Sequence, residues 1–319
     1  MRPLLLALLI SVAVGLASSA GEPKALCGDL IVFHAGSLSV PFKAIADAFQ
    51  EEHPGVRVLL EAAGSRACAR KIADLGRPCD VFGSADYAVI DTLLIPDHAD
   101  WCIRFATNEM SIVYSEASRR SDEITAANCF EILLLEDVAY GRSDPDLDPC
   151  GYRTVLTAKL AEQYYRRPGL AEELLAKDQR HIRPKETELL ALLEAEAIDY
   201  IFLYRSVAQQ HGLKCLLLPD AVNLKRPELT SHYKSVSVEL TGKTPAETVT
   251  RYGEPMVYGV TIPHRTANPG AALAFVRFLL EQDRGRAIME SNGQPSVIPA
   301  VTPSYGRIPE ALKQFAAAP

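Results

Sequence analysis

The chain has 319 residues, of which 48% are hydrophobic and 23% charged, and its formal net charge is −7. This is the composition of a globular protein with enough apolar residues for a sizeable core, and the length predicts two domains. The negative charge disfavours nucleic acid as a partner, because a phosphate-binding face needs clustered Lys and Arg. Small anions stay possible, since backbone dipoles bind them whatever the net charge.

The N-terminal segment is typical of a secretory signal peptide. Arg2 is the only charge before an apolar block at 3–16, which small residues follow at 17–20. The block is short for a membrane span, so we expect residues 1–20 to be cleaved, with an uncleaved anchor as the alternative. Losing Arg2 changes the net charge from −7 to −8. We therefore expect a soluble protein in the periplasm or an equivalent extracytoplasmic compartment.

Seven cysteines follow, at positions 27, 68, 79, 102, 129, 150 and 215. Their spacing does not suggest a zinc site. An exported protein can form disulfides, but an odd count leaves at least one thiol free, and the pairing is not set by the sequence. Lys24-Ala25-Leu26 precedes Cys27 in place of the small apolar triplet of a lipoprotein signal, so we expect no lipid anchor.

The first third of the chain alternates strands and helices, which predicts a parallel, doubly wound sheet. In chain order we expect strands at 29–34, 56–61 and 80–82, each followed by a helix, ending near 53, 75 and 94.

The remaining chain predicts a second α/β region between two extended segments. The extended segments are 105–114 and 256–262. Between them we expect helices near 126–134, 154–177 and 187–195, and strands at 138–140, 200–203 and 215–218. After the second extended segment we expect helices at 270–281 and 283–291. This layout predicts two lobes joined by two extended crossovers. Lobe 1 would comprise 27–107 and 256–319, and lobe 2 would comprise 108–255. The polar segment 220–254 gives no readable pattern.

Two of the expected strand-to-helix turns carry the pair Gly-Ser, at Gly36-Ser37 and Gly64-Ser65. In open α/β sheets, ligands bind at the carboxyl ends of the strands, where helix N-termini attract anions. The alternative is that each serine only caps its helix. Both interpretations stay open, whereas we interpret the third turn, Gly83-Ser84, as a cap alone.

Alternating acids at Asp144, Asp146 and Asp148 resemble the start of a calcium-binding loop. The resemblance fails at once, because Pro149 stands where that loop needs glycine and Val155 where it needs glutamate. Asp148 followed by Pro149 is typical instead of a turn into a helix, with proline in the first helical turn.

Other polar residues flank these turns. Glu186 opens the next expected helix. We expect Arg142 and Arg153 to pair with the aspartates near them in sequence. His34 is expected to be a strand-end residue and not a catalytic base.

Eight stretches together resemble the tungstate/molybdate-binding proteins of ABC importers. They are HAGSLS, EAAGSR, FATNEMSIVYS, DPCGYR, RPKETELLALLE, IDYIFLYRSVAQQH, MVYGVTIP and NGQPSVIP, and all lie between residues 29 and 300. The resemblance implies an α/β, two-lobed periplasmic-binding-protein type II fold with a doubly wound sheet in each lobe. It also implies a monomer, without enzymatic activity or a resident cofactor, that delivers the oxyanion to a membrane permease with its ATPase.

The same resemblance implies a set of ligand-binding residues. On the matching motifs these are Gly36, Ser37, Ser65, Asp148, Pro149, Cys150, Glu186 and Tyr204. Asp148 and Glu186 would bind the metal centre of the oxyanion, because Mo(VI) and W(VI) are hard, electron-poor centres that suit oxygen donors. Four oxo groups and two carboxylate oxygens would make six-coordination, whereas the same carboxylates would repel sulfate and phosphate.

Three alternatives remain. Asp148 and Glu186 can be ordinary helix-start residues. The ligand can be sulfate or phosphate. The fold also hosts transferases, although no GxSxG, P-loop or HExxH motif is present. The sequence does not rank tungstate over molybdate.

Overall fold

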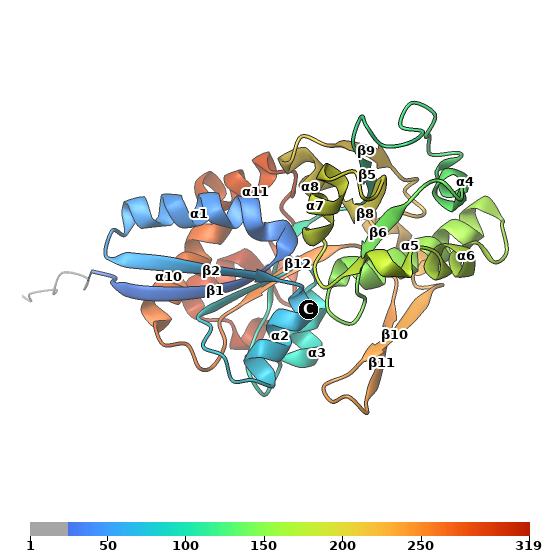
Figure 1. Ribbon diagram of the computed structural model, residues 1–319. Helices are drawn as coiled ribbons and strands as arrows, with labels where there is room; N and C mark the ends of the chain where they lie inside the picture. The colour runs from blue at the N-terminus through green and yellow to red at the C-terminus, as the bar shows by residue number, and fades with distance from the viewer. Residues whose placement is uncertain (1–24) are drawn as a thin grey trace, which may run out of the picture.

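A computed structural model describes residues 25–319 and contains two five-stranded sheets flanked by helices (Figure 1). The predicted α/β class is confirmed. The predicted signal peptide, residues 1–20, lies outside the described residues.

The first sheet has the strand order β2-β1-β3-β12-β4. Its strands are β1 (Gly28–Ala35), β2 (Val56–Ala63), β3 (Val81–Ser84), β4 (Ile103–Thr107) and β12 (Val257–Thr261). The helices of this half are α1 (Ser39–Glu52), α2 (Ser65–Ala73), α3 (Tyr87–Leu93), α10 (Pro269–Leu280) and α11 (Ala287–Ser291). Phe49 of α1 packs edge-on against Phe275 of α10, with ring centroids 5.3 Å apart, so α10 packs beside α1 in this half.

The second sheet has the strand order β7-β6-β8-β5-β9. Its strands are β5 (Met110–Tyr114), β6 (Tyr140–Ser143), β7 (Ile182–Arg183), β8 (Tyr200–Tyr204) and β9 (Lys214–Leu217). The helices of this half are α4 (Cys129–Leu134), α5 (Pro149–Tyr165), α6 (Leu170–Ala176), α7 (Glu188–Glu194), α8 (Arg205–Gln210) and α9 (Thr230–Tyr233).

Each sheet is mixed, although strand–helix alternation predicted parallel sheets. β12 runs antiparallel to β3 and β4, and β5 runs antiparallel to β8 and β9. The physical reason is that β5 and β12 are the strands on which the chain enters each sheet from the other half. The extended crossovers therefore become sheet strands. The lobe boundaries given above remain our proposal.

The unreadable segment 220–254 contains a hairpin of β10 (Ser237–Thr241) and β11 (Thr248–Tyr252). The hairpin extends from the body of the molecule in Figure 1, and it contacts the first half of the chain. Arg70 of α2 donates to the carbonyl of Gly242 at 2.8 Å, and Lys243 pairs with Asp97 at 2.6 Å. The two halves thus touch through this hairpin as well as through the crossovers.

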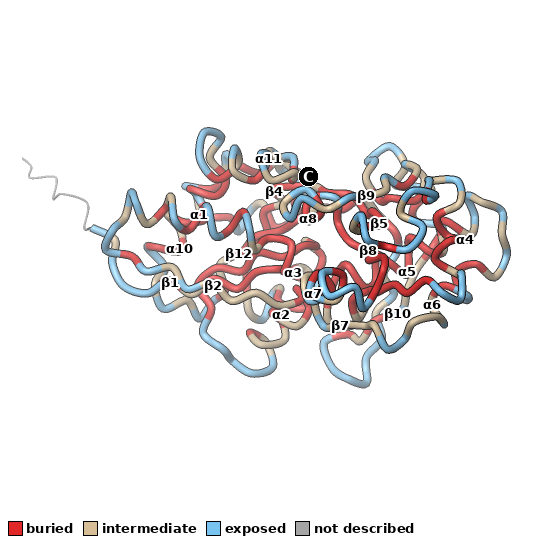
Figure 2. Tube along the Cα trace, turned by 45° about the horizontal axis from the view of Figure 1, so that its top comes forward, coloured by how far each residue is buried: buried red, intermediate tan, exposed pale blue. Residues whose placement is uncertain are grey.

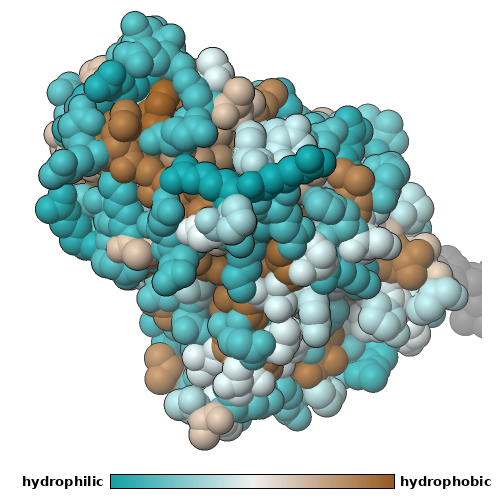
Figure 3. All heavy atoms as spheres, turned by 90° about the vertical axis from the view of Figure 1, so that its right-hand side faces the viewer, coloured by the Kyte–Doolittle hydropathy of each residue, from teal (hydrophilic) through white to brown (hydrophobic). Residues whose placement is uncertain are grey.

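Buried segments lie inside both halves of the molecule and also near the place where the halves meet (Figure 2). Seen from the end that carries α4 and α6, the surface is mostly hydrophilic, with apolar atoms gathered in a few places (Figure 3). Over residues 25–319, no helix is both long enough and apolar enough to cross a bilayer. All seven cysteines lie in this part of the chain and are free thiols, so the described structure contains no disulfide.

Candidate binding site

The two Gly-Ser turns lie side by side at one edge of the first sheet. β1 and β2 are parallel and Ala35 is paired with Ala63, so each turn directly follows a paired residue. The N-cap residues are Ala35 for the short 3-10 helix at Gly36–Leu38, Leu38 for α1 and Gly64 for α2, so neither Ser37 nor Ser65 stands at a cap position. The interpretation of these serines as helix caps alone is therefore wrong.

The cap predicted at Gly83-Ser84 is also wrong. Both residues belong to β3, and the N-cap of α3 is Asp86, whose carboxylate accepts from Ala88 N at 3.0 Å. Ser84 instead exchanges hydrogen bonds with the backbone of Asp86.

The second sheet contributes the acidic residues and Tyr204 from its own carboxyl edge. Asp148 caps α5, with Oδ1 accepting from Cys150 N at 3.3 Å, while Oδ2 accepts from Glu186 N at 3.0 Å. Glu186 lies two residues before α7 and does not open it, contrary to prediction. Tyr204 is the last residue of β8. β6 pairs in parallel with both β7 and β8, so the chain leaves all three strands at the same edge.

The two carboxyl edges face each other at close range, and glycine makes this possible. A Cβ atom on Gly36 would lie 2.8 and 2.9 Å from the two carboxyl oxygens of Glu186. A Cβ atom on Gly64 would lie 2.4 Å from the carbonyl oxygen of Leu147, and Ala67 N donates to that same oxygen at 3.1 Å. The glycines of both turns thus leave room for the acidic loops of the second sheet.

Every residue assigned to the site from sequence is buried at this junction. The set comprises Gly36, Ser37, Ser65, Asp148, Pro149, Cys150, Glu186 and Tyr204. Pro149 begins α5, and the Cys150 thiol contacts the carbonyl of Phe202 at 3.5 Å. The Cys150 thiol is thus occupied and Pro149 has no polar side-chain atom, so Cys150 contacts Asp148 through its backbone N–H.

Three hydroxyls of the site each accept a hydrogen bond from the protein. Ser65 Oγ accepts from Ala85 N at 3.0 Å, and Tyr204 Oη accepts from Arg153 Nη1 at 2.9 Å. Ser37 Oγ accepts from the hydroxyl of Tyr258 at 3.1 Å. An accepting hydroxyl keeps its own O–H free to donate. The arrangement therefore presents three neutral donors.

Glu186 is the exceptional group. Both of its carboxyl oxygens are buried without a hydrogen-bond partner, although buried polar atoms nearly always have one. Burial and the negative charge of Asp148 raise the pKa of Glu186 well above its ordinary value. Burial also raises the pKa of Asp148, against the hydrogen bonds it accepts. An electropositive centre between the two carboxylates would remove this penalty.

The structure adds residues that sequence reasoning missed. Tyr258 Oη accepts from Asn108 Nδ2 at 2.9 Å, and Gln294 Nε2 donates to the carbonyl of Ser37 at 2.9 Å. Gln294 Oε1 and Ser143 Oγ are buried without partners. Asn108, Tyr258 and Gln294 stand in stretches quoted above and Ser143 does not. No local pattern distinguishes the first three, because their contacts span long separations in the chain.

His34 and the two arginines complete the comparison with prediction. His34 lies near the end of β1, as predicted, and burial lowers its pKa to about 4, so its ring is neutral. Arg142 donates to the carbonyl of Leu175 at 3.1 Å, and within residues 25–319 it has no carboxylate partner. Arg153 was expected to pair with a sequence neighbour, but its carboxylate partner is Asp86, at 3.6 Å. Both arginine predictions are wrong, because folding brings other acceptors closer.

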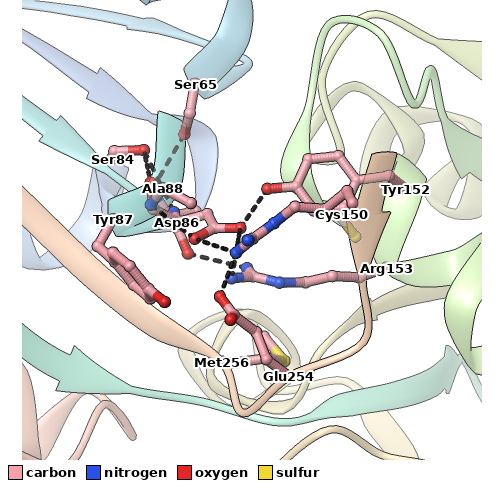
Figure 4. Close-up of polar contacts among 12 residues, drawn as sticks. Ser65, Ser84, Asp86, Tyr87, Ala88, Cys150, Tyr152, Arg153, Glu254 and Met256 are labelled. Atoms are coloured by element: carbon pink, nitrogen blue, oxygen red, sulfur yellow. Dashed lines mark hydrogen bonds and ion pairs between the residues drawn. The ribbon is translucent and has the colours of Figure 1, made fainter. Parts of the chain in front are cut away.

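Asp86 is the centre of a buried polar cluster between the halves of the chain (Figure 4). Its carboxylate accepts from the hydroxyl of Tyr152 and from Arg251 at 3.0 Å, and Arg251 also pairs with Glu254. Burial opposes its ionisation, but Arg251 and Arg153 outweigh burial and lower the pKa of Asp86 to about 2.

Comparisons with known proteins agree with this fold. Residues 30–317 match the model of the family described as bacterial extracellular solute-binding protein. The chain is 50% identical to an uncharacterized solute-binding protein of Petrotoga mobilis, over 91% of this chain and 90% of that one. It is 41% identical to the molybdate/tungstate-binding protein WtpA of Pyrococcus abyssi, over 89% and 88% of the two chains.

Two solved structures show the same fold at low sequence identity. The periplasmic molybdate-binding protein of Azotobacter vinelandii aligns with a TM-score of 0.60 and 17% identity, over 85% of this chain and 99% of that one. The sulfate-binding protein SubI of Mycobacterium tuberculosis aligns with a TM-score of 0.57 and 16% identity, over 85% and 88%.

Proposed function

The chain belongs to the bacterial extracellular solute-binding protein family, and on that premise we propose that it captures tungstate or molybdate for an ABC importer. The name of the relative at 41% identity supports this choice of ligand. We further propose that the protein is exported by its signal peptide, acts as a monomer outside the cytoplasm, and delivers the oxyanion to a permease with its ATPase. It is a transport component and not an enzyme.

The observation that carries the proposal is the pair of buried carboxylates. Glu186 has two unpartnered oxygens beside Gly36, and Asp148 adjoins it through the backbone of Glu186. Two carboxylates repel an anion that exposes only oxygens, and desolvation makes the repulsion costly. They attract an oxyanion with a hard, accessible metal centre. We propose that each gives one oxygen to tungsten or molybdenum, which completes six-coordination.

The hydroxyls supply the other half of the recognition. Ser37, Ser65 and Tyr204 each accept one bond from the protein and keep a hydrogen for the oxo groups. Closing the lobes on the ion would bring these donors and the carboxylates to the same ligand. Because the donors are neutral, the charge preference of the site is set by the two carboxylates.

A calorimetric competition among tungstate, molybdate, sulfate and phosphate tests the proposal. Tungstate and molybdate should bind at least 100-fold more tightly than the other two, and should raise the melting temperature by mass action. Equal or tighter binding of sulfate or phosphate would contradict the proposed ligand class.

A further inference from the structure

Arg153 links the two halves of the candidate site. It lies in α5 and is almost completely buried. One of its nitrogens, Nη1, donates both to the hydroxyl of Tyr204 at 2.9 Å and to the carbonyl of Ala85 at 2.8 Å. Tyr204 ends a strand of the second sheet, whereas Ala85 follows a strand of the first. A single guanidinium therefore bridges both sides of the junction.

The contact with Ala85 continues to a second hydroxyl of the site. The backbone N–H of Ala85 donates to Ser65 Oγ at 3.0 Å. The backbone N–H of Ala85 thus occupies one lone pair of the Ser65 hydroxyl, while the carbonyl of the same residue accepts a hydrogen bond from Arg153. Tyr204 and Ser65, on opposite edges, take their orientation from the same arginine.

The charge of Arg153 is already neutralised. Asp86 lies 3.6 Å from its Nη2 (Figure 4). The neighbouring Arg251 pairs with both Asp86 and Glu254. Two arginines and two carboxylates balance within the cluster. Arg153 therefore acts by geometry more than by attracting an anion, and a planar guanidinium supplies fixed donor directions that an ammonium does not.

We propose that Arg153 is a positioning residue that orients the hydroxyls of Tyr204 and Ser65 together, with Asp86 as its fixed counterion. The inference rests on the proposed function, because it concerns hydroxyls assigned there to the oxyanion. It explains why neutral donors from two separate sheets reach the ligand with their hydrogens free.

A double-mutant cycle with tungstate as the probe tests this inference. Arg153→Lys should weaken tungstate binding more than tenfold in the wild-type background. In the Tyr204→Phe background, where the positioned hydroxyl is absent, the same change should cost less than threefold. Arg142→Lys is the matched control, since Arg142 is a nearly buried arginine of the same half that contacts neither hydroxyl. It should change affinity less than twofold.

The outcomes separate the inference from the function on which it rests. Equal losses from Arg153→Lys in both backgrounds, or no loss in a folded variant, would overturn the positioning role while tungstate binding by the wild type stands. Absence of tungstate binding by the wild type would overturn both. If Arg153→Lys does not fold, Asp86→Asn replaces it. Asp86→Asn should weaken tungstate binding at least threefold in the wild-type background and less than twofold in the Tyr204→Phe background. Equal losses of affinity in the two backgrounds would refute the positioning role.

Discussion

Replacing Gly64 with alanine should keep the two sheet edges apart. The added Cβ would lie 2.4 Å from the carbonyl oxygen of Leu147 and 2.9 Å from that of Pro184. Ordinary contacts begin at 3.4 Å, so the nearer oxygen must move by 3.4 − 2.4 = 1.0 Å. Both oxygens belong to the backbone and cannot rotate away as a side chain does. The closed arrangement must therefore open at this point.

The cost follows from overpacking at a tight contact, about 1–3 kcal/mol. Opening also lengthens the hydrogen bond from Ala67 N to Leu147 O, now 3.1 Å. Tungstate affinity should fall by roughly 5-fold to 150-fold, the equivalent of that energy. The free energy of unfolding without ligand should change less, because the strain exists only when the edges meet.

Titration calorimetry with tungstate and thermal unfolding without ligand measure the two effects. Gly306→Ala is the control, because a Cβ there meets nothing within 4 Å. Gly36→Ala should also weaken binding, since its Cβ would press on the Glu186 carboxyl group at 2.8 Å. If Gly64→Ala binds tungstate as tightly as Gly306→Ala does, the edges do not meet around the ligand and the reasoning fails.

Three further predictions test separate parts of the account. Ser37→Ala and Ser65→Ala should each cost about 1–3 kcal/mol in tungstate binding, the scale of a hydrogen bond to a charged group; calorimetry would contradict this if affinity stayed unchanged. Asp148→Asn and Glu186→Gln should each reduce tungstate binding more than tenfold and leave any weak sulfate binding equal or stronger, whereas a gain for both ions would refute metal coordination. Because the pKa of Asp86 is lowered from 3.8 to about 2, its ionisation stabilises the fold above pH 4, and this contribution is lost as the pH falls to 2. Denaturant unfolding should show the wild type losing about 2 kcal/mol more than Asp86→Asn over that interval, and equal losses would contradict the pairing.

Much of the fold could be predicted from local sequence patterns. Helical spacing of apolar residues and glycine-containing turns placed α1, α2 and the parallel pair β1 and β2 within a few residues of their ends. The two Gly-Ser turns were expected at one sheet edge, and the pairing of β1 with β2 puts them there. The alternation of strands and helices could not show that β5 and β12 run antiparallel to their neighbours in the sheets, because the direction of these strands depends on where the chain crosses from one sheet to the other.

The hairpin of β10 and β11 shows a different limit. Residues of β11 alternate only between half-buried and exposed, so no apolar face marks the strand. Its position depends on distant partners, among them Asp86 for Arg251 and the α2 arginines for the turn. Local propensity carries no information about such contacts.

The candidate site also contains residues that the sequence could predict and residues that it could not. Asp148 and the glycines stand in recognisable turns, and the resemblance to a family added Glu186 and Tyr204. The predicted ion-pair partner of Arg153 is wrong, because the sequence around an arginine does not indicate which distant carboxylate the fold brings close to it. Asp86 lies 67 residues from Arg153 (153 − 86), and that contact exists only after both sheets have formed.

The number of oxygen neighbours around the bound metal tests the central claim most directly. X-ray absorption spectroscopy of the tungstate complex measures this number at the tungsten edge. If Asp148 and Glu186 each bind the metal, the spectrum should fit six oxygen neighbours, and Glu186→Gln should lower the number or lengthen one bond. Four oxygen neighbours in the wild-type complex would show an intact tetrahedral ion held only by hydrogen bonds, and would contradict the account.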